Sequence, residues 1–137
     1  MTRSAVLLVV AIAACAEAGA RPRQVPGGDA RRGARLIAQY GCGGCHTVPG
    51  IAGARGLVGP PLTAFGARAY IAGSLRNEPE ALVRWIRFPQ LVEPGTAMPD
   101  LGVTDAHARD IAAYLYTLGK GTLGPPHLIS PQVLPQH

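Results

Sequence analysis

Two thiols three positions apart, with an imidazole directly after the second, stand in the segment Cys42-Gly43-Gly44-Cys45-His46. This C-x-x-C-H pattern is typical of covalent attachment of one c-type haem. Each thiol can add across one vinyl group of a single porphyrin, and His46 can then reach the iron from the same side. Gly43 and Gly44 carry no side chains. The loop is therefore expected to lie close to the ring, in backbone conformations that are closed to other residues.

Other uses of the motif have less support. A structural zinc site usually takes four Cys or His ligands in two spaced pairs, and the third cysteine, Cys15, lies in an apparent export signal. A thioredoxin-like redox pair needs a βαβ setting, and the flanking residues do not alternate as strands do. A disulfide between Cys42 and Cys45 stays open as an alternative.

The N-terminus reads as a signal peptide. Arg3 precedes an unbroken apolar run at 5–14, which is shorter than the roughly 20 residues that span a bilayer. The run ends in Ile12-Ala13-Ala14-Cys15, which resembles the bacterial lipobox. In that case Cys15 is lipidated and contacts the membrane. The alternative is ordinary cleavage after 18–20. Either route predicts export, to the periplasm or to the outer face of the cytoplasmic membrane.

Segments rich in proline and glycine divide the chain into regions. A signal peptide at 1–14 (to 20 under the second route) is followed by a linker at 15–27. One domain is expected at 28–120, and a proline-rich tail at 121–137. The domain has few aromatic residues for its core, because the whole chain has seven, and a buried macrocycle would compensate for this.

The formal net charge is +5, and the basic residues are spread along the chain. Nucleic-acid binding needs clustered charge, so we expect no nucleic-acid partner. The expected partner is instead a redox protein with an acidic docking surface, since complementary charge mainly speeds encounter. A generally solvated basic surface is the alternative explanation.

Helical patterns recur and strand patterns do not. Helices are expected near 29–40, 77–88 and 104–118, with a loop at 47–61. Asn77 is expected to cap the second helix. No stretch alternates as a strand, so the predicted fold class is all-α.

A second axial ligand for the iron would decide the function. Met98 is the only methionine outside the signal peptide, and it lies in the predicted loop at 94–99. A thioether ligand favours ferrous iron and raises the potential. The alternative is that Met98 fills a gap in the core. His107 is a rival ligand, but it is expected to be an exposed histidine of the third helix.

The same residues, in this order, resemble a class I c-type cytochrome, and the resemblance covers nearly all of 28–118. It includes Gly28–Gly33, the C-x-x-C-H segment, Gly59-Pro60-Pro61-Leu62, Pro94–Pro99 and Ala113–Tyr116. The resemblance implies three main helices and loops wrapped around one covalent haem and its iron. The stretch 68–73 is loosely similar to cytochromes that partner haem–copper oxidases.

By this resemblance, the Pro60 carbonyl accepts a hydrogen bond from His46, and Gly33 meets Tyr114 where the first and last helices cross. Trp85 resembles a tryptophan that binds a haem propionate, with ordinary core packing as the alternative. Weaker propionate candidates are Arg68, Tyr70, Arg84 and Arg87.

The implied function is one-electron transfer in an exported respiratory chain, by a carrier that is not itself an enzyme. The alternatives are a haem subunit fixed in a dehydrogenase or oxidase complex, and a gas-binding or catalytic haem protein. Redox proteins, among them a membrane terminal oxidase, are the expected partners.

Overall fold

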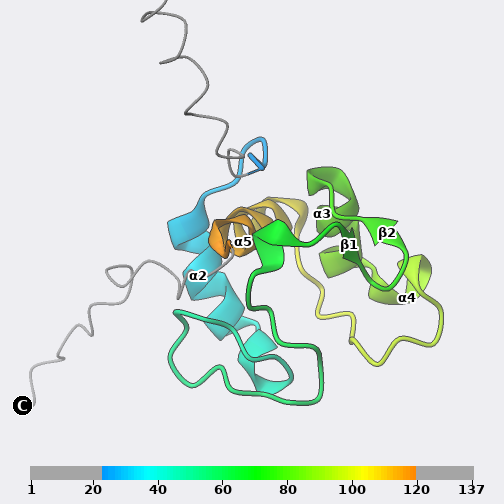
Figure 1. Ribbon diagram of the computed structural model, residues 1–137, viewed down its shortest axis with the longest axis horizontal. Coiled ribbons are helices and arrows are strands. Elements are labelled where there is room, and N and C mark those ends of the chain that lie inside the picture. The colour runs from blue at the N-terminus through cyan, green and yellow to red at the C-terminus, as the bar shows by residue number, and fades with distance from the viewer. Residues whose placement is uncertain (1–22, 120–137) are drawn as a thin grey trace, which may run out of the picture.

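The computed structural model describes residues 23–119. The predicted signal peptide, the lipobox at Cys15, the linker up to residue 22 and the whole predicted tail at 121–137 lie outside these residues. Helices dominate the described part (Figure 1), in agreement with the predicted class. In chain order the elements are α2 (Ala30–Gln39), η2 (Cys42–Gly44), η3 (Phe65–Ala67), β1 (Tyr70–Ile71), β2 (Leu75–Arg76), α3 (Pro79–Arg87), α4 (Pro89–Val92) and α5 (Asp105–Thr117). None of the described helices is long and apolar enough to cross a membrane.

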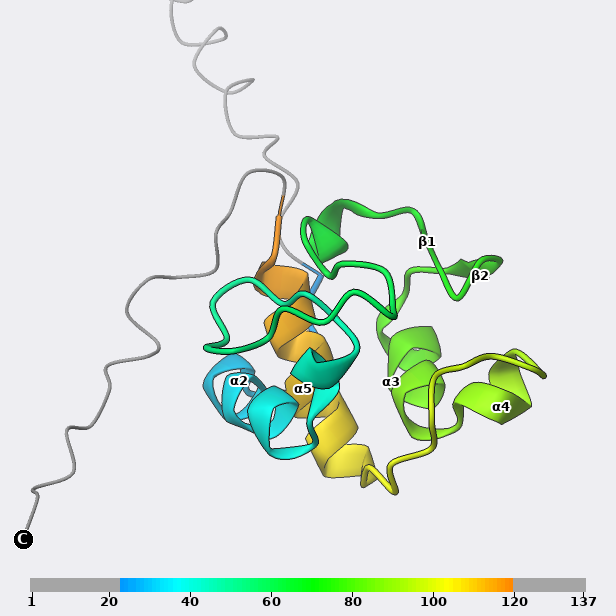
Figure 2. The same ribbon diagram turned by 90° about the horizontal axis from the view of Figure 1, so that it is seen from below.

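Helices α2 and α5 cross in close contact, as Figures 1 and 2 show from two directions. A Cβ built on Gly33 would lie 1.9 Å from the main-chain oxygen of Asp110, so only glycine allows this approach. The crossing was predicted, but the backbone that Gly33 faces is that of Asp110 and Ile111, one turn before Tyr114. Helix α2 begins as expected, with the Asp29 carboxylate accepting a hydrogen bond from the Arg32 main-chain N–H at 3.0 Å.

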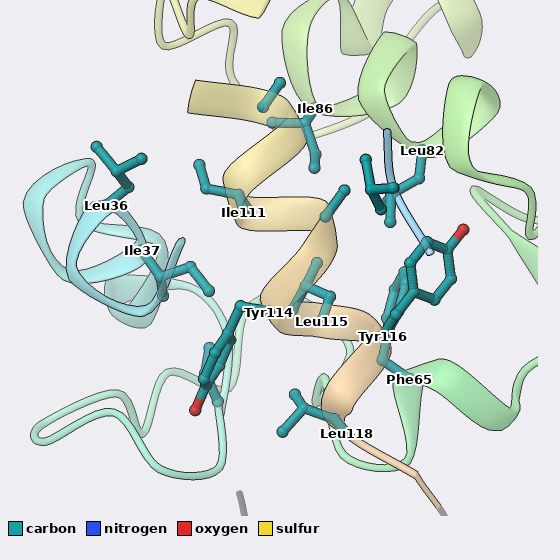
Figure 3. Packing of buried hydrophobic residues seen from close by; sticks show 14 of the residues in the cluster. Leu36, Ile37, Phe65, Leu82, Ile86, Ile111, Tyr114, Leu115, Tyr116 and Leu118 are labelled. Carbon is teal, nitrogen blue, oxygen red and sulfur yellow. The ribbon is translucent and has the colours of Figure 1, made fainter. Parts of the chain in front are cut away.

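The core lies where α5 is enclosed by α2 on one side and by α3 on the other (Figure 3). Apolar side chains at helical spacing on each element face this centre, which explains why three short helices hold together. The largest buried apolar side chains include Ile37, Leu82, Tyr114 and Leu118.

Asn77 does not cap α3, contrary to the prediction, because Glu78 occupies the N-cap position. Asn77 itself is only 1% exposed. The amide donates to the main-chain oxygens of Phe65, at 3.0 Å, and Arg68, at 3.1 Å, and it accepts from the Tyr116 hydroxyl at 3.0 Å. Asn77 therefore ties the segment before β1 to α5.

The expectation of no strand is wrong at one place. Strands β1 and β2 form an antiparallel hairpin in which Tyr70 pairs with Arg76 and Ile71 pairs with Leu75. Each strand has two residues, too few for an alternating pattern to be recognised in sequence. The turn between them requires positive φ at Ala72 (49°) and Gly73 (81°).

Candidate functional site

The C-x-x-C-H segment follows directly after α2 and folds as the short helix η2. The main-chain N–H groups of Cys45 and His46 donate to the Cys42 carbonyl at 3.3 and 3.0 Å, which brings the two thiols and the imidazole onto one compact turn. Both thiols are free and half-buried. Burial raises the pKa of the Cys42 thiol.

The expected backbone freedom is needed at a different glycine. Gly41, just before the motif, has φ 72°, whereas Gly43 and Gly44 have no positive φ. The prediction of unusual angles at those two positions was therefore wrong. Gly43 is needed for space instead, because a Cβ there would lie 2.6 Å from the Cβ of Ala54.

The imidazole of His46 is fixed on two sides. Its Nδ1 lies 2.7 Å from the carbonyl oxygen of Pro60, so the predicted hydrogen bond is present. A carbonyl can only accept, which makes Nδ1 the donor and leaves the Nε2 lone pair available for a metal. Gly59 lies against the ring, and its main-chain N–H donates to the Cys45 carbonyl at 2.8 Å.

Apolar surface next to this imidazole lies uncovered. The side chains of Leu57 and Val58, immediately before Gly59, are 89% and 79% exposed. A large apolar ring bound through His46 would give such side chains something to pack against. Two thiols, an imidazole with a free Nε2 and uncovered apolar residues together fit a covalently attached haem.

Met98 lies on a separate segment, the loop between α4 and α5, which in Figures 1 and 2 lies across the domain from η2. Its main-chain oxygen accepts a hydrogen bond from the side-chain amide of Gln90 at 2.6 Å. Its main-chain N–H donates to the Thr96 hydroxyl at 3.3 Å. Sequence reasoning missed Gln90, because a lone polar residue on a four-residue helix carries no signal of its partner.

Trp85 is half-buried and packs against the core from α3. Among the weaker propionate candidates, Arg68 donates to the main-chain oxygens of Pro61 and Thr63. Arg87 pairs with Asp105 at 2.9 Å. Arg84 and Tyr70 are exposed on the surface.

His107 was predicted to be exposed, and this prediction is wrong. It is half-buried, and its Nδ1 lies 2.8 Å from the hydroxyl of Tyr40, which follows α2. The apolar stripe of α5 gave no indication of this contact, since it joins two polar groups across the helix pair.

A sequence model of the cytochrome c family matches residues 30–119, which include the C-x-x-C-H turn, Pro60 and Met98. This chain belongs to the cytochrome c family. As a member of this family it carries covalently bound haem c with iron.

Cytochrome c oxidase subunit 2 of Alkalihalophilus pseudofirmus is 40% identical to this cytochrome c over 92 residues. The match covers 65% of this chain and 25% of that relative. The chain thus spans about a quarter of the curated relative that it matches. No solved structure matches the chain.

Proposed function

We propose that this cytochrome c is a one-electron carrier with a class I fold, in which three main helices and their loops enclose a single haem. Cys42 and Cys45 would form the thioether links, and His46 and Met98 would ligate the iron. When bound, the haem supplies a one-electron couple through its iron. If His46 and Met98 both ligate the iron, a substrate would find no free coordination position, which favours a carrier over an enzyme.

The observation that supports this proposal most is the hydrogen bond from His46 Nδ1 to the Pro60 carbonyl, 2.7 Å long. It fixes the tautomer and the plane of the imidazole, as partners of metal-bound histidines usually do. Gly59 allows the ring to lie close to the main chain. His46 is therefore preorganised to bind a metal through Nε2. In the same proposal, Trp85 donates to a haem propionate.

Optical spectra of the haem-loaded protein, oxidised and reduced, test the ligand set. We expect a weak near-infrared band in the oxidised protein that disappears in Met98→Ala, since such a band reports sulfur–iron ligation. Acid–organic extraction should leave the pigment on the chain. Release of the pigment would contradict the thioether links, and rapid carbon monoxide binding by the reduced protein at neutral pH would favour a gas-binding haem instead.

A second candidate function is that of a haem domain fixed in an oxidase or dehydrogenase complex. It is supported by the likeness to an oxidase subunit, of which the present chain spans a quarter. Co-purification of the full chain from its native membrane would distinguish the candidates. A freely exchanging carrier should separate from oxidase activity at moderate salt, whereas a fixed subunit should stay with it.

We further propose that the chain acts outside the cytoplasm, in a respiratory chain in which redox proteins such as a membrane terminal oxidase are its partners. The apolar run at 5–14 and the lipobox-like Cys15 support export. Intact mass of the native protein tests the processing route. A lipid-modified N-terminal Cys15 would support anchoring, and a chain beginning at Arg21 would support ordinary cleavage.

A further inference from the structure

We propose that Gln90 is a positioning residue for the methionine ligand. Its side-chain amide holds the main chain of Met98 in the conformation that presents the thioether to the iron. The proposal rests on the ligation by Met98 proposed above, and it concerns a residue that does not itself touch the metal.

The geometry ties both main-chain polar groups of Met98. The Gln90 amide nitrogen lies 2.6 Å from the Met98 carbonyl oxygen, and the Met98 N–H lies 3.3 Å from the Thr96 hydroxyl. Because a carbonyl only accepts, the Gln90 group must be the NH₂ donor. A carboxylate at position 90 could not make this bond and would repel the carbonyl dipole.

Gln90 is itself well placed to act as an anchor. It stands on α4, whose first residue, Pro89, is fully buried, and the Glu93 N–H closes the turn on the Pro89 carbonyl at 2.8 Å. The loop at 93–104 has no helix or strand of its own. Gln90 therefore connects this short helix to a loop whose other hydrogen bonds are local, such as that from the Thr96 N–H to the Glu93 carbonyl at 3.1 Å.

The consequence concerns competition for the iron. A thioether is a weak ligand for ferric iron, so an external ligand can replace it whenever the loop moves away. The apparent affinity of that ligand depends on the population of the displaced loop. Losing one neutral hydrogen bond should increase this population about three- to tenfold.

The test uses the oxidised haem-loaded protein, with imidazole as the competing ligand. We expect Gln90→Glu and Gln90→Ala to bind imidazole about three- to tenfold more tightly than the parent. The matched control, Gln39→Ala, removes an exposed glutamine at the end of α2 and should leave the affinity unchanged. The melting temperature of each variant is measured as well. Tighter imidazole binding without a lower melting temperature than that of Gln39→Ala would exclude a general loss of stability as the cause.

Two results separate this inference from the proposed function. If Met98→Ala abolishes the near-infrared band and the Gln90 variants bind imidazole like the parent, the role of Gln90 is wrong and the ligation stands. If Met98→Ala leaves the band and the imidazole affinity unchanged, the ligation itself is wrong, and the positioning role is wrong with it.

Discussion

The imidazole of His46 lies directly on the backbone of Gly59. A Cβ built at position 59 would stand 2.3 Å from Cε1 and 2.6 Å from Nδ1 of the ring, closer than real Cβ atoms approach other atoms. Glycine at this position is thus a condition for the hydrogen bond between His46 and Pro60.

We expect Gly59→Ala to push the ring off the Pro60 carbonyl and to lower the free energy of unfolding by about 1–3 kcal/mol. Denaturant titration of the haem-loaded protein measures this change, and the absorption spectrum should show a smaller low-spin fraction. Thr63→Ala, an exposed position four residues further along the same loop, is the control and should keep the spectrum of the parent. An unaltered spectrum in Gly59→Ala would argue against a fixed ring.

Gly33→Ala should be more harmful, because its Cβ would meet a main-chain atom, the Asp110 oxygen, at 1.9 Å. The two helices must separate to relieve this contact, and we expect a loss of about 3 kcal/mol in the free energy of unfolding. Ala38→Gly, at an exposed position of the same helix, should lose only about 1 kcal/mol. Similar losses in both variants would contradict the close crossing.

Asp110 is fully buried, and its carboxylate accepts hydrogen bonds from the Asp29 main-chain N–H and from the Arg32 guanidinium, both at 2.8 Å. Burial alone would raise the pKa of Asp110, but the hydrogen bonds from Arg32 and Asp29 outweigh it and hold the pKa below the ordinary value of an aspartate. The stabilisation is therefore present above the ordinary pKa and is lost as the pH falls through the lowered one.

We expect Asp110→Asn to lower the free energy of unfolding by about 1–2 kcal/mol at neutral pH. The loss is no larger because Arg32 is half-exposed and solvent screens its charge. The stability of Asp110→Asn should also fall less than that of the parent between about pH 5 and pH 2. Thermal unfolding across this range measures both. Glu93→Gln, an exposed carboxylate change, is the control. An equal acid-induced fall in Asp110→Asn and the parent would show that another group dominates.

Asn77→Ala should lower the free energy of unfolding by about 3 kcal/mol, since the main-chain oxygens of Phe65 and Arg68 and the Tyr116 hydroxyl would lose their partner. Tyr116→Phe removes only one of these bonds and should lose about 1 kcal/mol. The double variant should lose less than the sum of the two, because they share one interaction. Additive losses would show that Asn77 and Tyr116 act separately.

Local sequence patterns were sufficient to predict the haem motif and the first and last helices. The predicted spans 29–40 and 104–118 agree closely with α2 and α5, because capping residues and apolar spacing act within a few positions. The contact of His46 with Pro60 came from a family resemblance and not from spacing.

Contacts between distant polar residues were not predictable. Asn77 stands in a good local capping pattern, but partners at Phe65 and Tyr116 compete for it and prevail. The pairing of Gln90 with Met98 likewise leaves no period or composition in the sequence. Such pairings exist only once the chain has folded, so no local rule detects them.

The contact between α2 and α5 joins segments that are synthesised early and late in the chain. Asp29 and Asp110 meet although 81 positions separate them. A ribosome produces the chain from its N-terminus, so the apolar face of α2 has no cover until α5 has been synthesised. The C-x-x-C-H turn at 42–46 therefore belongs to the part of the chain that is made before the α2–α5 contact can form.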